Sequence, residues 1–112
     1  MRKINKGKEY MHFKGNRYRV LGISKPKKKL KNIKDLSPIE AEHTETGKKV
    51  IVYVSKNLNT MHLIDDLGNE EYVLYVSCKD NKKWLRPLNM FASMVDAKKY
   101  PEHAGKYRFT EI

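Results

Sequence analysis

Apolar and polar residues alternate over several short runs of this chain, and a period of two is the spacing of half-buried β-strands. Near the N-terminus, two such runs cover residues 10–14 and 17–23, with Gly15 and Asn16 between them. Both residue types tolerate the positive φ that a tight turn often needs. This part of the chain therefore predicts a β-hairpin.

Two later runs, residues 49–55 and 71–78, are rich in valine and tyrosine, which favour strands. Weaker signals predict another strand that ends at Arg86 and a closing strand over 105–112. Between them, the segment 87–94 begins with proline and places its apolar residues on one side of one or two helical turns.

Many short strands, frequent turn signals and almost no helix predict a mainly β fold. The expected form is a small, strongly bent β-barrel that leaves no strand edge free. A length of 112 residues predicts a single domain spanning 1–112. Within it we expect a frayed basic arm over 1–8, a basic loop insertion over 25–38 and a loop insertion over 57–69.

The positive charge of the chain is concentrated in its first third. The net charge is +11, and residues 1–34 hold thirteen Lys and Arg against one acid. Residues 35–112 hold eleven basic residues against twelve acids, so they are almost neutral. A field of this kind attracts anions, which could be a nucleic acid, an anionic surface or a phosphorylated small ligand.

Composition excludes several classes of protein. The chain lacks a run of about 18 apolar residues and a signal-peptide pattern, so we expect a soluble, cytoplasmic protein with no membrane partner. The single Cys78 excludes an internal disulfide framework and a multi-cysteine zinc site. The hydrophobic content of 39% is lean, and a homo-oligomer would bury more apolar surface.

The strongest candidate site is Trp84 together with Arg86, two positions apart on the expected strand. Pro87 pushes Arg86 toward an extended conformation, and alternate residues of a strand share a face, so both could face one cleft. An indole stacks on a planar ligand, and a guanidinium binds an anionic oxygen in two parallel hydrogen bonds. The alternative is that Trp84 belongs to the core and Arg86 to a surface ion pair.

Further candidates fall into three chemical types: aromatic rings for stacking, cations for phosphate, and residues that line the pocket or contact a base edge. The stacking candidates besides Trp84 are Phe13, Tyr18 and Tyr53, although tyrosines also pack in cores. The cations besides Arg86 are Lys14 and Arg19, and the histidine candidates are His12 and His43. Together these residues would make a site for a nucleotide.

Catalysis is not expected. The four histidines lack the i, i+4 spacing of a helical metal pair, and the glycines are scattered singly, so no phosphate-binding glycine loop is present. No nucleophile accompanies the His43 and Glu45 pair. We therefore expect a binding protein without a metal or cofactor.

Three separated motifs together resemble a short bacterial and phage domain family of unknown function. They are HFKGNRYRVL at 12–21, HTETG at 43–47 and WLRPLNMF at 84–91. The resemblance covers 8–24, 41–55 and 83–109. It implies an SH3-like β-barrel, with a short helical turn after the Trp-x-Arg-Pro motif and with segments 25–40 and 57–79 inserted.

In general character the chain is also similar to phage-encoded sponge proteins of the anti-CBASS type, which sequester cyclic nucleotide signals of bacterial immunity. This resemblance implies a homo-oligomer in the host cytoplasm that binds a cyclic dinucleotide without chemistry. The alternative, based on charge, is a nucleic-acid-binding module that uses the basic N-terminal third. A domain that docks peptides is a third reading, based on the barrel alone.

Overall fold

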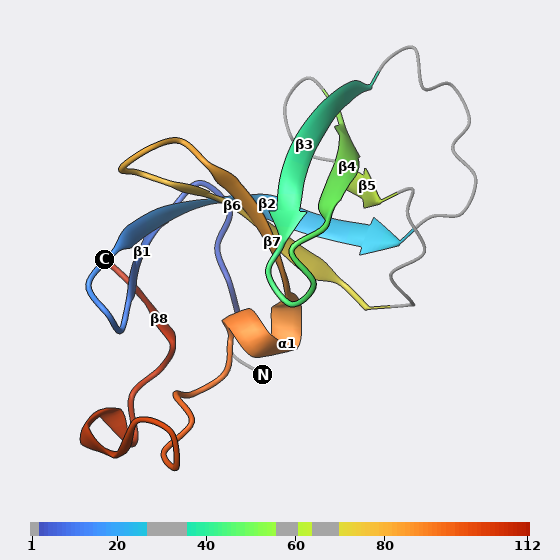
Figure 1. Ribbon diagram of the computed structural model, residues 1–112. Helices are drawn as coiled ribbons and strands as arrows, with labels where there is room; N and C mark the ends of the chain where they lie inside the picture. Colours follow the sequence, from blue (N-terminus) through green and yellow to red (C-terminus); the bar gives the residue numbers. More distant parts are fainter. Residues whose placement is uncertain (1–2, 27–35, 56–60, 64–69) are drawn as a thin grey trace.

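The computed structural model describes residues 3–26, 36–55, 61–63 and 70–112, and its strands form one sheet (Figure 1). The strands are β1 (Glu9–His12), β2 (Arg17–Pro26), β3 (Ser37–His43), β4 (Lys49–Val54), β5 (Met61–Leu63), β6 (Tyr72–Ser77), β7 (Lys83–Pro87) and β8 (Phe109–Glu111). Two short helices complete the fold, α1 (Leu88–Phe91) and the 3-10 helix η2 (Pro101–His103). The mainly β prediction and the helical turn after Pro87 are confirmed.

The sheet curls strongly but is not closed into a barrel. Its strand order is β5-β4-β3-β7-β6-β2-β1-β8, with parallel contacts between β3 and β7 and between β2 and β5. The β2–β5 contact involves only the pairs Lys25–His62 and Pro26–Leu63. Over the described strands this is no continuous ladder, and β1 and β8 extend the sheet beyond β2, so the barrel part of the prediction is wrong.

The predicted hairpin is confirmed as β1 and β2. The His12 N–H donates to the Asn16 carbonyl, and the Gly15 N–H donates to the His12 carbonyl, both at 2.8 Å. Gly15 has a φ of +103°, a conformation that a side chain would strain. The turn therefore holds residues 13–16 in a compact loop at the end of the sheet.

Strand β6 is buried on both faces and divides the core into two clusters. Tyr72 and Leu74 face the first cluster, which lies among β3, β4 and β7. Val73 and Tyr75 face the second cluster, which lies under α1 and β8. Alternate side chains of β6 thus pack into two different clusters, which explains the continuous apolar run in this segment.

The second cluster is built mainly from aromatic rings. Phe91 from α1 and Phe109 from β8 stack in parallel, with centroids 4.0 Å apart. The ring of Tyr75 meets both edge-on, at 5.1 and 5.5 Å, and Tyr10 meets Phe91 at 5.6 Å. These contacts attach the last strand and the helix to the centre of the sheet.

The expected frayed arm packs against the domain over its described residues 3–8. Ile4 is only 8% exposed and belongs to the second cluster. The Asn5 N–H donates to the Tyr10 hydroxyl at 2.8 Å, and the Gly7 N–H donates to the Val20 carbonyl at 2.8 Å. The Lys8 carbonyl also accepts the Val20 N–H at 3.0 Å, and the Asn5 side-chain amide donates to Glu111 at 2.7 Å, so one apolar side chain and several hydrogen bonds hold this otherwise polar segment.

The expected loop boundaries also change. Strand β2 continues through Pro26 and β3 begins at Ser37, so a loop over 25–38 is shorter at both ends. The insertion expected over 57–69 contains β5, which pairs with β4. Residues 27–35, 57–60 and 64–69 of these segments lie outside the described residues.

The aromatic cluster predicts a measurable contribution to stability. Phe91→Leu keeps an apolar residue but loses the stacked ring, so the free energy of unfolding should fall by about 1–3 kcal/mol. Urea denaturation would measure it. Ile112→Ala is the control, because this side chain is 61% exposed and its loss should change stability by less than about 0.5 kcal/mol. Equal effects of the two substitutions would contradict the packing described above.

Candidate functional site

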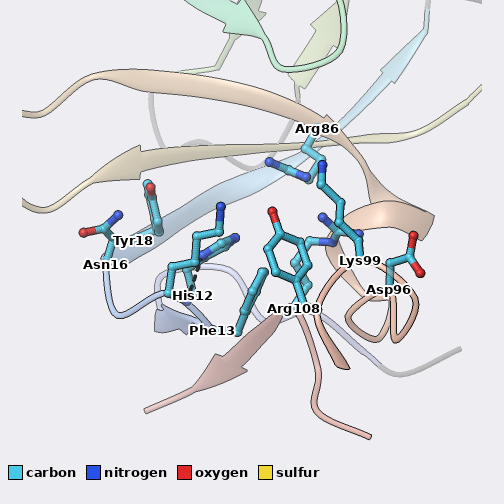
Figure 2. A pocket seen from close by; sticks show the side chains of 10 residues that line it. His12, Phe13, Asn16, Tyr18, Arg86, Asp96, Lys99 and Arg108 are labelled. Atoms are coloured by element: carbon cyan, nitrogen blue, oxygen red, sulfur yellow. Dashed lines mark hydrogen bonds between the residues drawn. The ribbon is translucent and has the colours of Figure 1, made fainter. Parts of the chain in front are cut away.

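A pocket of about 470 Å³ lies where the β1–β2 hairpin meets the segment between α1 and β8 (Figure 2). We call it the arginine pocket. It is lined by His12, Phe13, Lys14, Asn16, Tyr18, Arg86, Asp96, Lys99, Tyr100 and Arg108. The hairpin supplies one wall, the C-terminal segment supplies the other, and Arg86 enters from β7.

The two walls are joined through Phe13. Its backbone N–H donates to the Arg108 carbonyl at 3.0 Å, and its ring meets the Tyr100 ring edge-on at 5.0 Å. The Arg108 N–H in turn donates to the Ser93 carbonyl at 3.0 Å. These bonds bring side chains from distant parts of the sequence into one pocket.

Positive charge dominates the arginine pocket. Four basic side chains, Lys14, Arg86, Lys99 and Arg108, line it against the single carboxylate of Asp96. In the described part of the chain, neither arginine forms an ion pair with a carboxylate. The pocket therefore carries an excess of positive charge that an anion would neutralise.

The guanidinium groups of Arg86 and Arg108 differ in the partners that the fold gives them. The Arg86 Nε donates to the Tyr75 hydroxyl at 3.2 Å, and the guanidinium carbon lies 5.7 Å from the Phe109 ring centroid. Burial and the charge of Arg86 lower the pKa of Arg108. The buried Nε of Arg108 has no hydrogen-bond partner among the described residues. An unsatisfied cationic donor beside a like charge is costly, and an anionic oxygen would satisfy it.

His12 is held neutral among these cations. Burial, followed by the charges of Arg86, Arg108 and Lys14, lowers the pKa of His12 from 6.5 to about 4. The Lys14 backbone N–H donates to its Nδ1 at 3.2 Å, so the neutral ring carries its proton on Nε2. Two ring contacts fix the imidazole: a tilted one with Phe13 at a centroid distance of 4.5 Å and an edge-on one with Phe109 at 4.9 Å.

The Lys14 ammonium lies over two rings, 5.0 Å from the centroid of Tyr100 and 5.8 Å from that of Phe13. A hydrogen bond from Lys14 lowers the pKa of the Tyr100 hydroxyl. The ammonium therefore also links the two walls, and these contacts hold a flexible side chain at the pocket.

Of the nine residues that the sequence suggests for a site, the structure brings five together in the arginine pocket. They are His12, Phe13, Lys14, Tyr18 and Arg86. Tyr18 is partly buried and meets Tyr75 and Phe109 edge-on at 5.3 and 5.7 Å, so core packing takes up part of its ring.

Trp84 does not line the arginine pocket. It borders a smaller hollow of about 180 Å³, here called the tryptophan hollow, which is lined by Asn16, Arg17, Tyr18, Ser77, Lys79, Asp80 and Trp84. The Lys82 ammonium lies 4.2 Å from the indole centroid. Alternate residues of a strand share a face but are about 7 Å apart, so Trp84 and Arg86 reach separate hollows that have Asn16 and Tyr18 in common.

His43 is buried beside Tyr72 of the first core cluster and does not line the arginine pocket. It is 4% exposed, with Nδ1 2.8 Å from the Thr46 hydroxyl and Nε2 3.3 Å from the Tyr72 hydroxyl. Both ring nitrogens are thus occupied within the fold.

Tyr53 and Arg19 also lie outside the arginine pocket. Tyr53 belongs to β4, opposite Pro38 in the ladder with β3. Arg19 points away from Tyr18, because adjacent residues of β2 face opposite sides, and its guanidinium forms an exposed ion pair with Glu9 at 3.6 Å.

Sequence reasoning missed half of the pocket. The missed residues are Asn16, Asp96, Lys99, Tyr100 and Arg108. Arg108 lies between two aromatic residues in the closing strand that the sequence predicts over 105–112, which was a usable signal. Residues 96–100 lie in an irregular segment without periodicity, so no local pattern indicated which way they face.

A comparison with known families matches residues 37–111 to a family described as a protein of unknown function, DUF1653. The chain belongs to the DUF1653 family. The match includes Arg86 and Arg108 but not residues 8–24, and it extends over 57–79, which the motif resemblance treats as an insertion. No curated protein and no solved structure matches the chain.

The described residues of this DUF1653 member contain no group of three His, Cys, Asp or Glu side chains that could hold a metal ion. Neither α1 nor η2, the helices of the described segments, is long and apolar enough to cross a membrane.

The buried position of His12 predicts an acid-sensitive contribution to stability. Its pKa of about 4 in the folded protein lies below the usual 6.5, so the unfolded chain binds more protons between these values and stability falls as pH drops through them. Because the ring is only partly buried, screening reduces this loss to roughly 1–2 kcal/mol.

Urea denaturation of the wild type and of His12→Gln at several pH values would measure this effect. The substitution removes the titrating ring, so the variant should lose less stability between about pH 6.5 and pH 4. If the free energy of unfolding changed with pH by the same amount in both proteins, His12 could not be the partly buried neutral imidazole described here.

Proposed function

We propose that the arginine pocket binds a phosphate-bearing nucleotide of the cyclic dinucleotide type, and that the protein sequesters this signal without chemistry. One observation carries the proposal: four cations face a single carboxylate in a pocket whose walls contain aromatic rings. Cations bind phosphate and rings accept a base, so the pocket offers both kinds of contact that a nucleotide needs.

The arginines support a phosphate ligand in particular. A guanidinium presents a planar fork of donors, and phosphate oxygens accept two of them in parallel. Arg86 uses Nε for Tyr75, which leaves its terminal nitrogens for a ligand, and Arg108 has an unsatisfied buried Nε. A bound phosphate would relieve the repulsion between these two charges.

The size of the pocket supports a small ligand. A volume of about 470 Å³ lies within the range of roughly 300–1,000 Å³ that is typical of small-molecule sites. A second subunit that packed over the pocket would bury more of the nucleotide. A homo-oligomer with shared sites remains our prediction for this reason.

A sponge acts by mass action, since it lowers the free concentration of a signal without turnover. Useful competition with a receptor requires about nanomolar affinity, or roughly −12 kcal/mol. Charge-assisted hydrogen bonds from the cations, ring stacking and exclusion of water by a second subunit would together supply it. The similarity of this small, basic, single-domain chain to phage-encoded sponge proteins in general character is a further support for the proposal.

Binding measurements test this proposal directly. Cyclic dinucleotides should raise the melting temperature of the wild type, and calorimetry should give their affinity. Arg86→Gln combined with Arg108→Gln should weaken binding at least about tenfold, because each change removes a charge-assisted hydrogen bond. Arg19→Gln is the control, since this exposed arginine lies outside the pocket and its loss should leave the affinity unchanged. Release of an altered nucleotide would instead indicate an enzyme, and no binding would refute the proposal.

Nucleic-acid binding is a second candidate because of the tryptophan hollow. There an indole is flanked by Arg17, Lys79 and Lys82, which is the combination of stacking surface and cations that single strands use. The lysine-rich segment 27–35, which would add charge, lies outside the described residues.

Salt dependence distinguishes the two candidates. Oligonucleotide affinity should fall steeply with salt through counterion release. Arg17→Gln combined with Lys79→Gln should lower the slope of log affinity against log salt by about 2, while cyclic dinucleotide binding stays unchanged. Fluorescence anisotropy would measure both. If oligonucleotides bound only through Arg86 and Arg108, the tryptophan hollow would have no part in it.

A further inference from the structure

His12 lines the arginine pocket as a neutral ring, and its position allows it to contact a ligand. It lies at the end of β1, with its ring held between Phe13 and Phe109. Because the Lys14 N–H occupies Nδ1, the proton-bearing Nε2 is left to donate to a ligand. In Figure 2 the ring lies between Tyr18 and the arginines and faces the pocket.

We propose that His12 contacts the bound anion and takes up a proton from solvent when the anion binds, so that binding tightens as the pH falls. This inference rests on the proposed anion-binding function of the pocket and adds a proton to it. The proton goes to Nδ1 of His12, Nε2 keeps its own, and the ring becomes an imidazolium.

The coupling follows from the charges around His12. In the free protein, burial and three cations oppose a positive charge on His12: Arg86 from β7, Arg108 from the segment before β8, and Lys14 from the hairpin turn. A bound dianion would cancel much of this repulsion and would also attract the imidazolium directly. By linkage, an anion that stabilises the protonated ring of His12 must itself bind more tightly when that ring is protonated.

One hydrogen bond opposes this effect, and the other titratable groups that face the pocket have to be considered beside it. Protonation at Nδ1 breaks the hydrogen bond from Lys14, but that residue is exposed and water can accept the freed N–H. The remaining titratable groups that face the pocket are Asp96, Lys99, Tyr100 and Tyr18. Asp96 is the carboxylate of this set, so it needs its own control.

Sulfate is the probe, because it stays a dianion throughout the pH range and cannot itself take up the proton. Calorimetry at about pH 7.5 and about pH 5, in two buffers with different heats of ionisation, measures both the affinity and the number of protons exchanged. For the wild type we expect an affinity at least about threefold higher at the lower pH, with net proton uptake.

Three variants isolate His12. His12→Gln keeps a side-chain donor but cannot titrate, so its ratio of affinities at the two pH values should approach one. Asp96→Asn should keep the ratio of the wild type if the carboxylate is not the source. His103→Gln should also keep it, because this ring touches Phe13 at 5.2 Å but does not line the pocket. Circular dichroism at both pH values would confirm that each variant is folded.

The outcomes separate the two proposals. Sulfate binding with the same affinity at both pH values would refute the role of His12 and leave the anion pocket standing. The same would follow if His12→Gln kept the pH dependence or if Asp96→Asn lost it. Absence of sulfate and nucleotide binding at either pH would refute the anion pocket and this inference with it.

Discussion

The pairing of β8 with β1 attaches the C-terminal part of the chain to the N-terminal hairpin, and both the core and the pocket depend on it. His12 lies opposite Phe109 in this ladder, and Phe109 stacks on Phe91 in the second cluster. The residue before β8 is Arg108, whose carbonyl accepts the Phe13 N–H. The same short strand thus closes the aromatic core and positions a cation against the hairpin turn.

Aromatic packing also explains how the fold accommodates so many like charges in one place. Arg86 and Arg108 repel one another, and His12 is held neutral beside them. These features weaken the folded state, whereas the burial of Tyr75 and Phe109 behind the arginines stabilises it. Functional sites commonly combine unfavourable electrostatics with a rigid support of this kind.

Local patterns predicted the strands correctly, but they wrongly predicted that the sheet closes into a barrel. The hairpin and the buried run at 72–77 follow from alternation, turn residues and β-branched content. Whether the sheet closes into a barrel depends instead on the contact between β2 and β5, which covers only two residue pairs and which no local pattern encodes. The packed arm depended on one apolar residue, Ile4, whose burial required the rest of the core.

The sequence by itself determined that Arg86 lies on a strand before Pro87, and that Lys14 lies in a glycine turn after His12, because backbone preferences act over a few residues. Only the tertiary structure decided which side chains surround them. Arg86 meets Arg108, twenty-two residues later in the chain, whereas Trp84, two residues away, borders another hollow. Periodicity gives the face of a strand that a side chain occupies, but the neighbours on that face depend on how distant segments pack.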